Sequence, residues 1–117
     1  GDLVYKNKNG YIYFSSRKDN QIKYNGYRIE LEEIEQTIGK LSKVKENVVC
    51  FGKKNNQEQI TCWISHNSSI EKIIKDLSNL IPSYMMPKKF IETTKLPKNQ
   101  NGKIDRKLLK IGYFDGK

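Results

Sequence analysis

The segment "NGKIDR" at residues 101–106 places Lys103 directly after a glycine, between a polar loop and a basic run near the end of the chain. A lysine there could be a solvated surface charge, a contact to a nucleic-acid phosphate, or a catalytic charge. As a catalyst, a mobile ammonium would neutralise the negative charge that builds up on oxygens during phosphoryl chemistry. The preceding Gly102 would allow a close approach of the backbone. By itself the segment leaves all three uses open.

Histidine and cysteine usage excludes some chemistry. His66 is the only histidine, so a histidine-based metal cluster or a catalytic triad is excluded within this chain. Cys50 and Cys62 each lie in an apolar, strand-like stretch without CxxC spacing, which predicts buried, reduced thiols rather than a disulfide. The first ten residues lack the hydrophobic core of a signal peptide. Both observations favour a cytoplasmic protein.

Composition indicates one soluble domain with a basic surface. The 117 residues include 22 Lys+Arg and 13 Asp+Glu, a formal net charge of +9. Such a charge would suit a polyanionic partner, because lysine-rich faces bind phosphates through counterion release. The lysines are spread along the whole chain, however, whereas nucleic-acid modules concentrate them on one element beside aromatic platforms. We therefore expect a solvated basic surface and no nucleic-acid partner. No apolar run approaches the roughly 18 residues that span a bilayer, so no membrane partner is expected either.

Two β-hairpins are predicted near the N-terminus. Apolar and aromatic residues on both sides of the turn-forming "NKNG" predict the first, over residues 2–16. The second is centred on Asn25-Gly26, the strongest two-residue turn signal. The charged "RKDNQ" at residues 17–21 separates them and is a candidate boundary. Residues 1–16 are too few to bury their own aromatic face, so we expect them to belong to a larger body.

Helical periodicity begins at Glu30. The residues expected on its buried face are Leu31, Ile34, Ile38 and Leu41. Residues 47–51 and 59–64 are β-branched and aromatic, which predicts two strands that pair antiparallel. The polar residues 52–58 are predicted to be the loop between these strands.

A second amphipathic helix is predicted to open at Ser68, where Glu71 completes a capping box, and to stop before Pro82. Its expected buried residues are Ile70, Ile73, Ile74, Leu77 and Leu80. One more strand over residues 88–94 and a final helix with Asp105 as its N-cap complete the order. This sequence of elements predicts an α+β fold, in which hairpins and a short sheet are packed by two to three helices.

Four segments together resemble the adenylate-forming enzymes, the superfamily of acyl-CoA synthetases, amino-acid adenylation domains of peptide synthetases and D-alanine carrier-protein ligases. "SRKDNQIKYNGYRIELEEIE" (16–35) and "NGKIDR" (101–106) resemble two signature motifs of that superfamily. "GDL" (1–3) is similar to the end of a third motif, and "LIPSYMMPKKF" (80–90) to the segment between them. Four matches in order and spacing are specific, where one would be weak. The chain looks most like the amino-acid adenylation domains and D-alanine ligases.

The resemblance implies a division of the chain. Residues 1–18 would be the last hairpin of a large N-terminal adenylation body and the approach to a hinge, and residues 19–117 would be the mobile C-terminal lid. In that family the lid rotates between two half-reactions: a carboxylate attacks ATP to give an acyl-adenylate and pyrophosphate, and a thiol then displaces AMP. ATP and Mg²⁺ would be bound mainly by the N-terminal domain. This fragment alone would be inactive.

Residue by residue, the resemblance implies roles for the charged groups. Lys103 matches the lysine that reaches the substrate carboxylate and α-phosphate during adenylation, and Gly102 would support its loop. Asp2 matches an aspartate that accepts hydrogen bonds from the ribose hydroxyls, and Arg17 matches a second nucleotide contact. Asp19 matches the hinge residue, whose change of backbone dihedrals would turn the lid.

Gly26 and Arg28 lie in the hairpin that the family uses to line a pantetheine tunnel during thiolation. A glycine there would let a thin ligand arm pass, but the tight turn also demands glycine, and the sequence does not separate the two reasons. The implied acceptor is a phosphopantetheinyl carrier protein, or else CoA, and the implied substrate is an amino acid such as D-alanine. The alternatives are the lid of a fatty or other acyl-CoA synthetase, and a free-standing basic module that binds RNA or protein.

Overall fold

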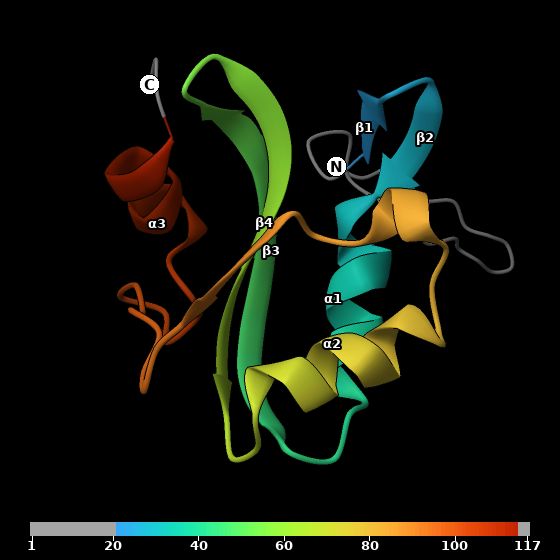
Figure 1. Ribbon diagram of the computed structural model, residues 1–117. Helices are drawn as coiled ribbons and strands as arrows, with labels where there is room; N and C mark the ends of the chain where they lie inside the picture. The colour runs from blue at the N-terminus through green and yellow to red at the C-terminus, as the bar shows by residue number, and fades with distance from the viewer. Residues whose placement is uncertain (1–20, 115–117) are drawn as a thin grey trace, which may run out of the picture.

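A long antiparallel hairpin is the centre of the fold in the computed structural model, which describes residues 21–114. Strands β3 (Val44–Lys54) and β4 (Gln57–His66) form this hairpin, and β5 (Lys89–Glu92) pairs with β4 in parallel, so that the sheet order is β3-β4-β5. Helices α1 (Leu31–Gly39) and α2 (Ile70–Ser78) lie on one side of this sheet and α3 (Arg106–Tyr113) on the other (Figure 1). A separate two-stranded sheet, β1 (Gln21–Tyr24) and β2 (Tyr27–Glu30), precedes α1. The predicted α+β class is confirmed. None of the described helices has the length and apolar character needed to cross a membrane.

Both hairpins close through two residues in left-handed backbone conformations. Asn25 and Gly26 have φ of 52° and 84°, and Tyr24 pairs directly with Tyr27, so the predicted hairpin is confirmed. The predicted loop over residues 52–58 is wrong, because only Asn55 and Asn56 form the turn, with φ of 54° and 65°. Asparagine tolerates this conformation, so the polar residues on either side continue the strands.

The sheet is buried on both faces, because alternate residues of its strands point to opposite sides. One core joins the sheet to α1 and α2; its sheet residues are Val49, Ile60, Cys62 and Ile64, and its helix residues include Ile34, Ile38, Ile73 and Leu77. The second core, on the α3 side, contains Val48, Cys50, Trp63, Leu96 and Phe114. Trp63 is 5% exposed, as expected of a core residue.

The two predicted core helices differ in how well their limits were predicted. Helix α1 begins after Glu30 as predicted, and its three apolar positions before Leu41 are buried. Helix α2 does not use the predicted capping box at Ser68, because the N-cap is Ser69, whose hydroxyl accepts from the N–H of Lys72 at 3.2 Å. The helix ends at Ser78, so Leu80 leaves its period and is 57% exposed, against the prediction.

After α2 the chain passes through Pro82 into a single 3₁₀ turn, η2 (Ser83–Met85), and buries Met85. Helix α3 has the predicted N-cap, with the Asp105 carboxylate accepting from the N–H of Leu108 at 3.1 Å. Leu109 packs against the second core, whereas Leu108 is 54% exposed. The structure thereby places the end of the Lys103 segment at the N-terminus of a packed helix.

The two cysteines are free and buried, as predicted, on opposite faces of the sheet. Burial raises the pKa of the Cys50 thiol from 9.0 to about 11 and raises the pKa of the Cys62 thiol well above its usual range. At pH 8 we expect the folded chain to react with Ellman's reagent at least ~100-fold more slowly than a free thiol, because two pKa units remove about that factor of thiolate. Both thiols should react rapidly in guanidinium chloride. Rapid modification of the folded chain would contradict their burial.

Candidate active-site loop and hairpin surface

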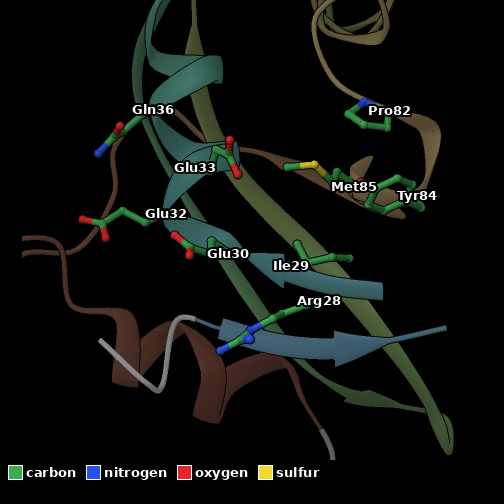
Figure 2. Close-up of a pocket in the computed structure, with 9 residues that line it drawn as sticks. All are labelled: Arg28, Ile29, Glu30, Glu32, Glu33, Gln36, Pro82, Tyr84 and Met85. Carbon is green, nitrogen blue, oxygen red and sulfur yellow. The ribbon is translucent and has the colours of Figure 1, made fainter. Parts of the chain in front are cut away.

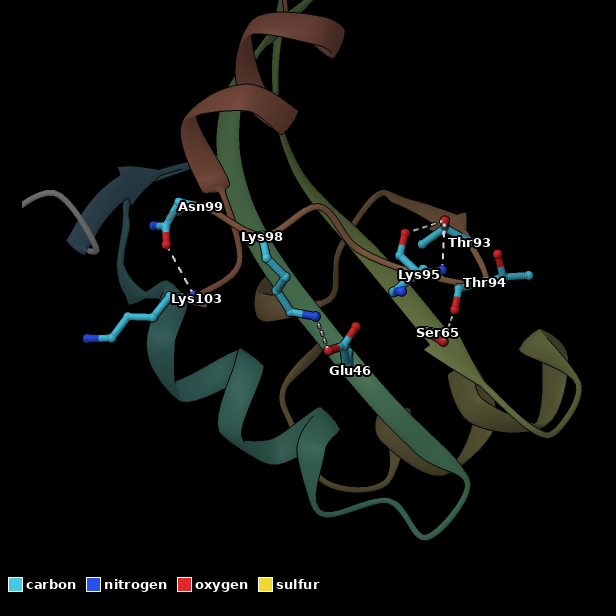
Figure 3. A network of polar contacts seen from close by, with 8 residues as sticks. All are labelled: Glu46, Ser65, Thr93, Thr94, Lys95, Lys98, Asn99 and Lys103. Carbon is cyan, nitrogen blue, oxygen red and sulfur yellow. Dashed lines mark hydrogen bonds and ion pairs between the residues drawn. The ribbon is translucent and has the colours of Figure 1, made fainter. Parts of the chain in front are cut away.

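Lys103 lies in a small loop that closes on itself. Lys98 and Ile104 form an antiparallel bridge at its base. The N–H of Asn99 donates to the carbonyl of Lys103 at 2.7 Å, and the Asn99 side-chain oxygen accepts from the N–H of Lys103 at 3.2 Å (Figure 3). The same oxygen accepts from the N–H of Asn101 at 2.9 Å. Asn99 therefore fixes the backbone on which Lys103 stands.

Gly102 completes the turn of this loop. Its φ is +80°, a conformation that side chains with a Cβ adopt only with strain. No atom lies within 4 Å of the place where a Cβ would be, so the backbone angle and not crowding accounts for glycine here. The loop is open on that side.

The side chain of Lys103 is exposed and extends away from the loop (Figure 3). No described residue forms a hydrogen bond or ion pair with its Nζ. A fixed backbone with an unengaged ammonium is suited to deliver a positive charge to a ligand outside residues 21–114.

Two ion pairs fasten the ends of the loop to the rest of the domain. At its start, Lys98 Nζ lies 2.6 Å from Oε2 of Glu46 on β3 (Figure 3), and this hydrogen bond lowers the pKa of the Glu46 carboxyl. At its end, Arg106 donates from Nη2 to Oε1 of Glu35 on α1 at 2.8 Å and from Nη1 to Oε2. The hydrogen bonds to Glu35 raise the pKa of Arg106.

Sequence reasoning missed these ion pairs. No role was predicted from the sequence for Glu35, Glu46 or Lys98. One signal was available: Glu35 and Arg106 each end one of the two signature motifs, which must meet in space if they serve one site. Nothing in the sequence marks Glu46 as the partner of Lys98.

A second surface surrounds the β1–β2 hairpin, which carries Gly26 and Arg28. The φ of +84° at Gly26, with no atom within 4 Å of a Cβ position, shows that the turn alone is enough to require glycine. Arg28 is exposed, and its Nη2 donates to Oε1 of Gln21 at 3.1 Å. The exposed rings of Tyr27 and Tyr84 stack 3.8 Å apart at 6° and so join the hairpin to η2.

A hollow of about 830 Å³ lies beside this hairpin. Figure 2 shows acidic and amide side chains of β2 and α1 on one side and the η2 segment on the other; the lining residues are Arg28, Ile29, Glu30, Glu32, Glu33, Gln36, Pro82, Tyr84 and Met85. The hollow places charged groups beside an apolar wall, which suits a ligand with both polar and apolar parts.

The structure thus assigns the predicted residues to two places. Gly102 and Lys103 share the loop that lies on the α3 side of the β3–β4 hairpin, whereas Gly26 and Arg28 share the hairpin on the side of α1 and α2 (Figure 1). No hydrogen bond or ion pair within residues 21–114 joins the two groups. The predicted residues Asp2, Arg17 and Asp19 lie outside the described residues, as does the first predicted hairpin.

Residues 33–103 match the model of the family described as the AMP-binding enzyme C-terminal domain. The chain belongs to this family. The superfamily resemblance expected from the motifs is therefore confirmed. The matched segment of this AMP-binding C-terminal domain runs from α1 to Lys103 and includes the two glutamates that hold the loop.

Curated relatives of the domain include D-alanine–D-alanyl carrier protein ligases and gramicidin S synthase 2. The D-alanine–D-alanyl carrier protein ligase of Bacillus licheniformis is 43% identical over 119 residues, covering 94% of this chain and 24% of the relative. The ligase of the same name from Lactococcus lactis is 38% identical, covering 93% and 24%. Gramicidin S synthase 2 of Brevibacillus brevis is 39% identical, covering 93% and 2%. The chain spans about a quarter of the length of the ligases.

Solved structures share the fold. ATP-bound MatB from Rhodopseudomonas palustris superposes with a TM-score of 0.81 at 25% identity, covering 98% of this chain and 24% of that one. A four-domain nonribosomal peptide synthetase bound to AMP and glycine has a TM-score of 0.70 at 30% identity, covering 86% and 8%. A fatty acyl CoA synthetase of Mycobacterium tuberculosis, with a TM-score of 0.78 at 24% identity over 94% of this chain and 23% of that chain, shows the fold alone.

Proposed function

We propose that the chain is the mobile C-terminal part of an ATP-dependent ligase. The full enzyme would activate an amino acid such as D-alanine as an acyl-adenylate and transfer it to the phosphopantetheine thiol of a carrier protein. The observation that carries the chemistry is the exposed, unengaged ammonium of Lys103 on a loop with a fixed backbone. The similarity of 38–43% to ligases named for a D-alanyl carrier protein supports the choice of substrate and acceptor.

In the proposed first half-reaction, a carboxylate oxygen attacks the α-phosphorus of ATP and pyrophosphate leaves. Negative charge then grows on the oxygens around phosphorus. Lys103 would stand beside the carboxylate and the α-phosphate and neutralise part of this charge. The lysine works as a positive point charge, so it needs reach and correct placement.

This part of the enzyme is proposed to contact ATP, but its described residues are not proposed to bind Mg²⁺. When bound, Mg²⁺ would supply positive charge against the phosphates of ATP. Within the described residues, no group of three acidic, histidine or cysteine side chains could hold a metal ion, and no Mg²⁺ ligand is proposed there. Asp2 and Arg17 are proposed to contact the nucleotide, the former through the ribose hydroxyls. The N-terminal domain of the same enzyme would supply the remaining contacts.

In the proposed second half-reaction, the hairpin with Gly26 and Arg28 faces the active site and lines the path of the pantetheine arm. No hydrogen bond or ion pair within residues 21–114 joins this hairpin to the Lys103 loop, which is compatible with their use in two orientations of the domain. Asp19 is the proposed hinge, with residues 1–18 on the N-terminal body and 19–117 in the lid. The cytoplasmic location stays a prediction.

The function is tested on the full-length protein by ATP–pyrophosphate exchange and acceptor loading. We expect exchange that depends on an amino acid, D-alanine among those tried, and radiolabelled product on a phosphopantetheinyl carrier protein. Exchange only with fatty acids and product only on CoA would instead support an acyl-CoA synthetase. Tight RNA binding with a steep salt dependence and no exchange would support the basic binding module.

A further inference from the structure

The carboxylate of Glu35 is the meeting point of three elements. It stands on α1, receives both guanidinium donors of Arg106 at the start of α3, and accepts the N–H of Val49 on β3 at 2.8 Å. Strand β3 is an edge strand in the three-stranded sheet, so the carboxylate also satisfies a donor that the sheet leaves free.

This ion pair differs from an ordinary surface pair. Exposed pairs contribute little, because water screens them and two flexible side chains must be ordered. Here the Arg106 side chain is 45% exposed but the Glu35 side chain only 12%, and the contact is bidentate, which fixes the direction of the guanidinium as well as its distance. The Glu35 backbone carbonyl is held as well, by the side-chain amide of Asn47 at 3.2 Å.

Arg106 stands three residues after Lys103, and the segment between them is short and hydrogen-bonded. The N–H of Asp105 donates to the carbonyl of Pro97 at 2.9 Å, and the bridge from Lys98 to Ile104 lies next to it. A displacement of Arg106 is therefore transmitted to the base of the loop. Near this end α3 is also held by its N-cap Asp105 and by Leu109, which packs against the second core, whereas Leu108 is exposed.

We propose that Glu35 is a positioning residue for Lys103: through Arg106 it sets the place from which the lysine ammonium reaches the reacting oxygens. This inference rests on the proposed function of Lys103. A misplacement of about 1 Å can cost a reaction step about 100-fold, so loss of the ion pair should matter in adenylation. Thiolation, which is proposed to use the β1–β2 hairpin instead, should not depend on it.

The test is Glu35→Gln in the full-length protein. Glutamine keeps the shape and can still accept the N–H of Val49, but it loses the charge that holds Arg106. We expect pyrophosphate exchange to fall about 10- to 100-fold, with no change in thiol transfer from a supplied acyl-adenylate. The matched control is Asp76→Asn, which breaks the exposed Lys72–Asp76 pair on α2 and should leave both steps unchanged.

Double variants separate positioning from general stability. If Glu35 acts through Lys103, then Glu35→Gln should cause no further loss of exchange in a Lys103→Ala background. Arg106→Lys, which keeps the charge without the bidentate geometry, should fall between wild type and Arg106→Gln. Equal losses in exchange and thiol transfer, additive losses with Lys103→Ala, or wild-type exchange in Glu35→Gln would each overturn the positioning role. Wild-type exchange in Lys103→Ala itself would overturn the proposed function of the lysine, and this inference with it.

Discussion

Replacing Lys103 with alanine in the full-length protein is expected to slow acyl-adenylate formation by about 100- to 1,000-fold, the usual cost of removing one well-placed electrostatic group. The side chain forms no hydrogen bond or ion pair with any described residue, so its removal should leave the loop and the fold intact. Thiol transfer from a supplied acyl-adenylate should continue at the wild-type rate, because in the proposed second half-reaction the hairpin surface would replace the loop. Pyrophosphate exchange and single-turnover transfer measure the two steps separately.

The control for Lys103→Ala is Lys107→Ala, another exposed lysine close by, on α3. This variant removes the same charge from the same region and should leave both half-reactions unchanged. If Lys103→Ala exchanges pyrophosphate as fast as wild type, the lysine has no part in adenylation. If both lysine variants lose activity equally, the general positive field of the surface is responsible instead.

The largest expected effect on folding comes from Gly52→Ala in β3. A Cβ at this position would lie 2.5 Å from Cγ of Phe114, and the ring would have to move. Phe114 is 6% exposed and packs edge-on against Trp63 and Tyr113 in the second core. We expect a loss of about 1–3 kcal/mol in the free energy of unfolding, as is typical of overpacked cores. Urea unfolding followed by the fluorescence of the chain's single tryptophan, which touches Phe114, measures it.

Gly112→Ala on α3 is the matched glycine control. No atom lies within 4 Å of its Cβ position, and alanine favours a helix over glycine by about 1 kcal/mol, so this variant should be slightly more stable than wild type. Equal stability of Gly52→Ala and wild type would show that the second core accommodates the extra methyl group without strain.

Local signals predicted the parts of the fold that depend on near neighbours. The Asn25-Gly26 turn, the start of α1 at Glu30 and the N-cap at Asp105 were predicted because each follows from the conformational preferences of a few adjacent residues. The N-cap of α2 was predicted one residue too early, because two neighbouring serines are equally good capping residues. Ser68 and Ser69 can both cap a helix, and the structure uses the second.

The parts of the candidate site that depend on long-range contacts could not be predicted from the sequence. The motif resemblance identified Lys103 and the hairpin residues, but Glu35 and Arg106 are 71 positions apart, and their pairing depends on how α1 and α3 pack against β3. The parallel pairing of β5 with β4 and the burial of both sheet faces also depend on contacts between segments far apart in the sequence. The pattern of apolar residues within a strand does not predict which helix or loop packs against each face of the sheet.

The hydrogen bonds of Asn99 also determine how much conformational entropy the lysine must lose. Ordering a flexible backbone costs about 1–2 kcal/mol for each residue, and a free loop of this length would lose that amount many times over on meeting its ligand. In the folded domain the backbone around Lys103 is already ordered, so only the rotamers of one side chain are lost, at about 1.5–2 kcal/mol. The entropic cost of presenting the charge is therefore met largely when the domain folds, before any substrate binds.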